Sequence, residues 1–330
     1  MDTDPCACSS LSRMETGHAG INSGWVNVPR ASIYWESSGA EDGIPVLYLH
    51  GGPGGSLGNR GYRSLYDPAR FRTIGLDQRG CGRSIPNACD VPEDLPFNTT
   101  GALIADIEAV RLHLGVEKWI VTGISWGATL ALAYALAHPQ RVLSVALAAV
   151  TATTRAEVQW FTEGAARFTP EDWHVFAGAA QARPHERLVE AYARRLAGAD
   201  PEDALKAARS WHQWEYAIAS MDPSVPPGPR FDGERSLLTF ALLVCHYWAN
   251  DAFLPGEQSI PHRIQELDGI PGVLIHGRRD IGSPIRTAWQ LNRRWHSSSL
   301  TVIEDEGHTG PKSLAALTAA VHRMGWNTGT

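Results

Sequence analysis

The chain has 330 residues, of which 43% are hydrophobic and 19% are charged, and its formal net charge is −6. This composition is typical of a globular protein, and the negative charge argues against a nucleic-acid partner, because such partners are usually bound by a basic face. No apolar run approaches the roughly 18 residues that a membrane-spanning helix requires. The five cysteines are scattered and odd in number, which argues against a disulfide framework.

The N-terminus is polar and acidic over residues 1–18, which is not the pattern of a secretory signal. We predict that residues 1–20 form a disordered tail and that the protein is cytoplasmic. The 13 histidines show no H-E-x-x-H or comparable grouping, so we expect no metal and no cofactor. Nothing in the sequence indicates an oligomeric state.

An antiparallel hairpin is expected where the tail ends. Segments 24–28 and 31–35 alternate apolar and polar residues, which is the pattern of two paired strands at a sheet edge. The run 45–50 is almost wholly apolar, as expected of a strand covered on both faces. Residues 100–114 place apolar side chains at helical spacing and predict a helix.

Strands and helices alternate along most of the remaining chain. Further buried strands are predicted at 72–77, 118–121, 142–147, 272–276 and 299–303, and a helix at 128–138. This alternation indicates a mostly parallel sheet flanked by helices. It stops over 152–264, where Trp, Ala and Arg recur at helical spacing. We therefore predict an α/β fold with its core in 21–151 and 265–330 and an inserted helical cap at 152–264.

The sequence Gly-Ile-Ser-Trp-Gly at 123–127 is a G-x-S-x-G elbow between a predicted strand and a predicted helix. A serine on such a sharp turn stands clear of the backbone, and the tight packing leaves no room for side chains at Gly123 and Gly127. The N-terminus of the following helix adds a positive dipole end where negative charge would develop. Ser125 is therefore a candidate nucleophile.

A serine nucleophile needs a base to take its proton, usually a histidine that a carboxylate orients. Asp280 and His308 follow Ser125 in the chain order serine, acid, histidine that α/β hydrolases use. Each follows a predicted strand, so all three can reach one edge of the sheet. A lone Asp there could cap a helix and a lone His could lie on the surface, but the three together indicate a catalytic triad.

Acyl transfer also requires two backbone N–H groups aimed at the developing negative oxygen. We expect one from Trp126, directly after the candidate nucleophile, and the other from Gly52 in the turn His50-Gly51-Gly52. The glycines let the backbone approach the substrate closely. The stretch does not fit a phosphate-binding loop, because no Lys-Ser/Thr follows it.

Several motifs combine with the elbow at 123–127. They are His-Gly-Gly-Pro-Gly at 50–54, Asp-Gln-Arg-Gly-Cys-Gly-Arg-Ser at 77–84, Asn-Thr-Thr at 98–100 and Trp-His-Gln-Trp-Glu at 211–215. Together they resemble the proline iminopeptidase family of α/β hydrolases, over nearly all of residues 24–325. The resemblance implies an α/β-hydrolase fold with a cap, and a serine aminopeptidase that needs no cofactor.

In that family, cap carboxylates hold the free α-amine of the substrate, so that one residue is removed from an N-terminus. Glu215, directly after Trp214, matches the first of these glutamates, and both are candidate substrate-binding residues. A charge pair with Glu215 in a partly desolvated pocket would be stronger than in water. The alternative is an ordinary solvated glutamate on a helix.

The candidate substrate site departs from the family pattern at three positions. Val244 stands where the resemblance implies a second amine-binding glutamate, and a valine cannot bind an amine. Thr151 and Thr162 fall where aromatic residues would enclose a proline ring. Glu234 and Asp251 are candidates to replace the missing carboxylate. We therefore expect the removed residue to be proline or another small residue.

Two other functions also fit the sequence. The triad could serve an amidase, esterase or acyl-processing enzyme on a non-peptide biosynthetic substrate, in a pocket widened by Thr151, Thr162 and Val244. The fold could also bind a ligand or support addition chemistry without hydrolysis, but such proteins often lose a triad member and this chain keeps all three. The favoured prediction is a serine aminopeptidase acting on a short peptide or small molecule, with no nucleic-acid or membrane partner.

Overall fold

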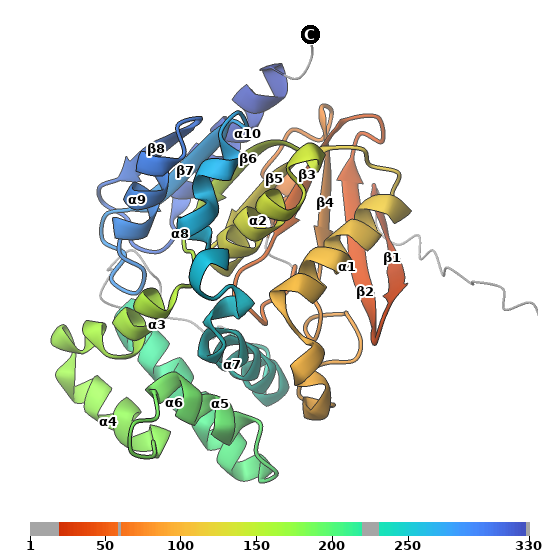
Figure 1. Ribbon diagram of the computed structural model, residues 1–330. Coiled ribbons are helices and arrows are strands. Elements are labelled where there is room, and N and C mark those ends of the chain that lie inside the picture. Colours follow the sequence, from red (N-terminus) through yellow and green to blue (C-terminus); the bar gives the residue numbers. More distant parts are fainter. Residues whose placement is uncertain (1–19, 59–60, 220–230, 328–330) are drawn as a thin grey trace, which may run out of the picture.

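The computed structural model describes residues 20–58, 61–219 and 231–327. These residues form one eight-stranded sheet with the order β1-β2-β4-β3-β5-β6-β7-β8 (Figure 1). The strands are β1 (Ile21–Val28), β2 (Ala31–Gly39), β3 (Ile44–Leu49), β4 (Phe71–Leu76), β5 (Trp119–Ile124), β6 (Val142–Ala148), β7 (Gly272–Gly277) and β8 (Ser298–Ile303). Pairing is antiparallel from β1 through β2 to β4 and parallel from β4 to β8. The hairpin expected at the sheet edge is confirmed.

The central strands send alternate side chains into two apolar clusters, one on each face of the sheet, because side chains alternate along a strand. Val121 and Leu274 belong to the cluster that includes apolar residues of α1, α2 and α9. Their neighbours Ile120 and Ile275 belong to the cluster that includes residues of α10. The helices are α1 (Thr100–His113), α2 (Trp126–Ala137), α9 (Arg286–Arg294) and α10 (Pro311–Asn327). Helices on both faces make the three-layer α/β arrangement expected from the sequence.

The remaining helices fall between β6 and β7. They are α3 (Arg155–Thr162), α4 (Pro170–Ala180), α5 (Leu188–Leu196), α6 (Pro201–Ala219), α7 (Glu234–Ala249) and α8 (Ile260–Arg263). Figure 1 shows α3 to α6 gathered beyond one end of the sheet, with α7 between them and the core helices. The ring of Trp211 contacts those of Phe161, Phe176, Tyr192 and Trp248 at centroid distances of 5.3–5.9 Å. We keep 152–264 as our interpretation of the cap.

Short 3₁₀ helices connect several of these elements, at Tyr62–Ser64, Pro92–Phe97, Pro139–Arg141, Gly164–Arg167, Asp251–Phe253, Gly256–Gln258 and Ile264–Leu267. Among the residues placed here, no helix has both the length and the apolar character to cross a membrane. The tail predicted at 1–20 lies outside the described residues except for Gly20.

Candidate active site

The elbow between β5 and α2 holds Ser125 in a strained backbone conformation with positive φ (φ 60° and ψ −124°). The two flanking glycines are required by contact distance. A Cβ at Gly123 would lie 2.2 Å from the carbonyl oxygen of Gly127, and one at Gly127 would lie 2.1 Å from that of Leu49. The helix, the strand and the end of β3 therefore pack backbone to backbone around the serine.

A hydrogen-bonded chain runs from this serine to a buried carboxylate. Ser125 Oγ lies 2.8 Å from His308 Nε2, and His308 Nδ1 lies 2.7 Å from Asp280 Oδ2. The carboxylate can only accept when ionised, so Nδ1 carries the ring hydrogen and Nε2 is left to accept the serine proton. The geometry therefore matches a nucleophile, a base and an orienting acid.

Asp280 is 6% exposed, and its surroundings favour the ionised form. Burial alone raises the pKa of this carboxyl, but the interactions with His308, His276 and the Ser283 N–H outweigh burial and hold the pKa below its usual value. Ser283 N donates to Asp280 Oδ1 at 2.8 Å. His276 accepts the Val150 N–H at Nδ1, and burial lowers the pKa of its imidazole.

The loop that carries His308 is fastened to the start of α10. The buried carboxylate of Glu306 accepts the N–H groups of Lys312 and Ser313 at 2.7 and 2.8 Å. A Cβ at Gly277, at the end of β7, would lie 2.0 Å from the carbonyl oxygen of Gly307. The histidine loop is thus fixed from both sides.

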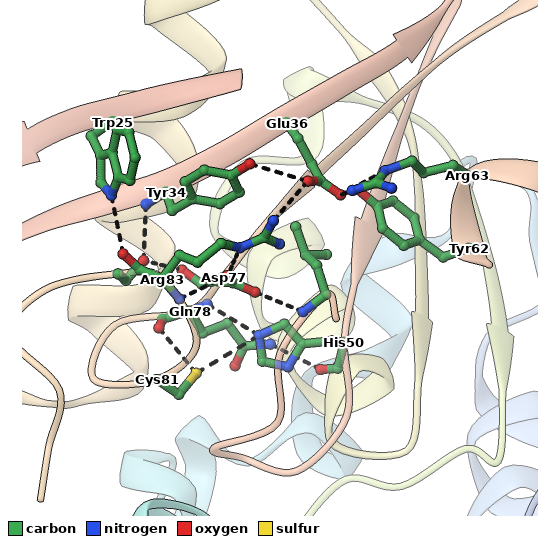
Figure 2. A network of polar contacts seen from close by, with 12 residues as sticks. Trp25, Tyr34, Glu36, His50, Tyr62, Arg63, Asp77, Gln78, Cys81 and Arg83 are labelled. Atoms are coloured by element: carbon green, nitrogen blue, oxygen red, sulfur yellow. Dashed lines mark hydrogen bonds and ion pairs between the residues drawn. The ribbon is translucent and has the colours of Figure 1, made fainter. Parts of the chain in front are cut away.

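Figure 2 shows the polar network behind the glycine-rich turn that follows β3. Asp77 accepts the Leu57 N–H at 2.6 Å and both the backbone N–H and Nε of Arg83 at 2.9 and 2.8 Å. Arg83 also pairs with buried Glu36, which accepts the hydroxyl of Tyr62. Burial raises the pKa of Tyr62, so this phenol stays a donor. The turn and the loop after β4 therefore support each other.

One cavity of about 140 Å³ lies against the strand ends and brings together most of the predicted site. The core contributes Ser125, Asp280, His308, Gly52, Trp126 and Thr151. The cap contributes a largely apolar wall, with Val158 and Phe161 from α3, Ile218 from α6, and Phe240 and Trp248 from α7. Glu215 of α6 also lines the cavity, and Trp211 Nε1 donates to its Oε1 at 3.2 Å.

A serine, an aspartate and a histidine in this chain order on an α/β sheet, under a helical cap, agree with what comparison with known proteins finds. The family model for the α/β hydrolase fold matches residues 44–311. A proline iminopeptidase of Neisseria gonorrhoeae is 40% identical over 306 residues, which is 91% of this chain and 95% of that protein. One of Arabidopsis thaliana is 36% identical over 297 residues, covering 89% and 77%. The chain belongs to the proline iminopeptidase family of α/β hydrolases.

Solved structures share the fold at lower identity. The proline iminopeptidase of Mycobacterium smegmatis superposes with a TM-score of 0.60 at 20% identity, over 93% of this chain and 99% of the other. The esterase RhEst1 of Rhodococcus sp. ECU1013 gives the same TM-score at 21% identity, over 94% and 100%. At this identity the two matches speak for the α/β-hydrolase fold alone.

Three residues that the family resemblance placed at the substrate do not lie on the cavity wall formed by the described residues. Trp214 is buried, and its Nε1 donates to the carbonyl of Phe161 at 3.0 Å, inside the aromatic core of the cap. The Thr162 hydroxyl donates a hydrogen bond to the carbonyl of Val158, four residues earlier in α3. Val244 is fully buried. Each of these side chains is used in packing rather than in the cavity.

The two carboxylates considered as substitutes at Val244 also lie elsewhere. Glu234 pairs with Arg209, and Asp251 pairs with Arg155 and Arg187. Neither is among the described residues that line the cavity. Neither residue therefore supplies the second amine-binding carboxylate that the family pattern has at the position of Val244.

Sequence reasoning missed several cavity residues, including Phe161, Ile218 and Trp248 on the apolar wall. It also missed Glu157, which lines the cavity while its carboxylate accepts the N–H of Thr154 at 2.9 Å. The spacing Thr-x-x-Glu is the signature of a capping box, so the start of α3 was detectable in the sequence. Which side chains of the cap face the cavity depends on the packing of several helices.

Proposed function

We propose that the protein is an aminopeptidase that removes one N-terminal residue, proline or another small residue, from short peptides or aminoacyl amides. The observation that carries this proposal is the Ser125–His308–Asp280 chain opening on a cavity whose cap wall bears Glu215. A nucleophile from the core and a carboxylate from the cap that line one small cavity suit a substrate whose scissile bond lies one residue from its free amine.

In the proposed reaction Ser125 Oγ attacks the carbonyl carbon of the first residue while its proton passes to His308 Nε2. Asp280 stabilises the resulting imidazolium, and the N–H groups of Gly52 and Trp126 bind the negative oxygen. The imidazolium then gives its proton to the leaving amine, and the acyl-enzyme forms. His308 then takes a proton from a water molecule, whose oxygen attacks the acyl carbon. As the ester bond breaks, the amino acid is released and His308 gives the proton to Ser125 Oγ.

The size and lining of the cavity favour a small first residue. A cavity of about 150 Å³ lined by apolar side chains holds a ring the size of benzene, and the volume here is about 140 Å³. Phe161, Ile218 and Trp248 can cover a pyrrolidine ring or a short aliphatic side chain. Glu215 then pairs with the α-ammonium group of the same residue.

The test is hydrolysis of a panel of aminoacyl 4-nitroanilides by the wild-type protein and by Ser125→Ala. We expect prolyl and alanyl substrates to be cleaved, their N-acetylated forms to be cleaved much more slowly, and the variant to lose at least about 10³-fold in kcat. Equal rates for free and acetylated substrates would contradict the proposal.

A second function is favoured by one observation, the buried apolar Val244 at the position of the second family glutamate. With a single amine-binding carboxylate, the cavity imposes a weaker requirement for an ammonium group. The same triad would then act as an esterase or amidase on a non-peptide acyl group. Cleavage of p-nitrophenyl esters together with inactivity on every free-amine nitroanilide would support this second function over the first.

A further inference from the structure

Gln78 follows β4 and is only 2% exposed, yet it is not among the described residues that line the cavity. Its side-chain Nε2 donates to the carbonyl oxygen of His50 at 2.9 Å, and its Oε1 accepts the indole N–H of Trp126 at 2.8 Å. A carbonyl only accepts and an indole N–H only donates, so the amide has one permitted orientation. The Gln78 amide thus joins the ends of β4, β3 and β5, which are neighbours in the sheet.

The backbone of Gln78 fixes the His50 ring as well, as Figure 2 shows. Gln78 N donates to His50 Nε2 at 3.1 Å, so the ring hydrogen is on Nδ1. His50 Nδ1 lies 2.9 Å from the carbonyl oxygen of Gly51 and donates to it. Both polar edges of the ring are therefore used to hold the turn.

The bond to Gly51 determines the direction of the next N–H. The Gly51 carbonyl and the Gly52 N–H belong to one peptide group, and in a trans peptide the two point in opposite directions. This peptide is trans, since the cis bonds of the described residues are Gly52–Pro53 and Ile85–Pro86. Holding the Gly51 oxygen at the His50 ring therefore turns the Gly52 N–H away from that ring.

We propose that Gln78 is a positioning residue for the oxyanion hole. Its backbone N–H holds the His50 ring and its side chain holds the His50 carbonyl, so both set the direction of the Gly52 N–H. Through the indole, the side chain also fixes the residue that supplies the Trp126 N–H. The inference rests on the proposed function, in which these two N–H groups bind the negative oxygen. Gln78 acts through other residues and touches no substrate.

Loss of this residue should slow acyl transfer more than it weakens binding. Removing an oxyanion donor altogether costs about 10²–10³-fold in kcat. A donor that is displaced rather than removed should cost less, and we expect about 10- to 100-fold for Gln78→Met, with KM changed by less than about threefold. A purely structural role would lower the free energy of unfolding without lowering the rate of the folded protein.

Three variants separate the two side-chain hydrogen bonds of Gln78, one to the His50 carbonyl and one from the Trp126 indole. Gln78→Met keeps the chain length and the backbone N–H bond to His50 but removes both side-chain bonds. Gln78→Glu still accepts from the Trp126 indole but, when ionised, cannot donate to the His50 carbonyl. Trp126→Phe keeps the His50 bond and removes the indole donor. If Gln78 and the indole act together, the Gln78→Met/Trp126→Phe double variant should lose less than the product of the two single losses.

The matched control is Thr122→Val. Thr122 is fully buried in β5 and donates to the carbonyl of Leu47 in β3 at 2.8 Å, so this variant also removes a buried bond between neighbouring strands. The bond between Thr122 and Leu47 lies within the strands rather than at their ends, where the candidate oxyanion donors lie. We expect it to lower the free energy of unfolding while keeping kcat within about threefold of wild type.

The measurements are the rate constant for labelling of Ser125 by a fluorophosphonate, and kcat and KM for a p-nitrophenyl ester, both with Ser125→Ala as the blank. The phosphonyl oxygen uses the same N–H groups, so labelling should slow in parallel with kcat in all three variants. Variants labelled within threefold of wild type, or slowed no more than Thr122→Val at equal stability, would overturn the inference. Wild-type protein that labels and cleaves esters but no free-amine substrate would contradict the proposed aminopeptidase, whereas slower labelling in the three variants would still support the role of Gln78.

Discussion

At the scale of single residues, the candidate site combines groups that are fixed with one that binds by charge. Asp280 and His308 are held by hydrogen bonds from several elements, and their geometry leaves His308 Nε2 facing Ser125. Glu215 lies on the cap wall and accepts a hydrogen bond from Trp211 in its own helix. Its proposed partner is the substrate ammonium.

Glu215→Gln therefore tests the binding charge without changing the shape of the cavity. A hydrogen bond to a charged group contributes about 1.5–3 kcal/mol, so we expect KM for free-amine substrates to rise about tenfold or more. KM for p-nitrophenyl esters without an amine should change little. Glu202→Gln is the matched control, because Glu202 lies on the same helix and is 77% exposed. An equal rise in KM for both substrate classes would remove Glu215 from amine binding.

The residues could be predicted from the sequence to different extents. Ser125, Asp280 and His308 could be predicted because their chain order and their positions after strands indicate a triad, and because the elbow glycines identify the nucleophile. The cap residues that line the cavity were harder to predict. Trp214 was expected at the substrate, but its indole N–H bonds to Phe161 in the cap interior. The rotation of a cap helix about its axis is set by contacts between aromatic rings, which adjacent residues in the sequence do not reveal.

At the scale of elements, periodicity predicted the strands and the helix α1 to within a few residues. It left out α9 and α10. In α9 only Ala288 and Leu291 are buried, so its apolar pattern is short. The elbow was predicted because its motif is contiguous in the sequence, although the contact that excludes a side chain at Gly127 comes from Leu49 at the end of β3.

This constraint can be measured with one replacement made at two places. Gly127→Ala would put a Cβ 2.1 Å from the carbonyl of Leu49, and we expect it to lower the free energy of unfolding by about 3 kcal/mol or to prevent folding. Gly178→Ala is the control, because Gly178 lies in α4 and an added Cβ would meet nothing within 4 Å beyond its chain neighbours and the backbone of its own helix. There the same change should stabilise by about 0.5–1 kcal/mol. Urea unfolding measures whether each variant lowers or raises the free energy of unfolding. A Gly127→Ala protein as stable as wild type would show that the elbow can relax.

At the scale of the whole molecule, the interpreted cap is joined to the core through α7. Tyr247 donates to Asn98 Oδ1 at 3.0 Å, and its ring lies 4.8 Å from that of Trp126. Thr239 donates to Asn87 Oδ1 at 2.7 Å. Our division at 152–264 therefore separates segments that share hydrogen bonds and a ring contact, and α7 links the other cap helices to the core.

Two buried thiols test whether cap and core open together. Burial raises the pKa of Cys81, in the core, and of Cys245, in α7, well above the ordinary value, so both stay protonated at pH 8. Alkylation then requires the surrounding structure to open. Because α7 is fastened to the core, we expect iodoacetamide to modify both at the same slow rate, read by mass spectrometry against unfolded protein. Modification of Cys245 at least tenfold faster than Cys81 would show that the cap opens by itself.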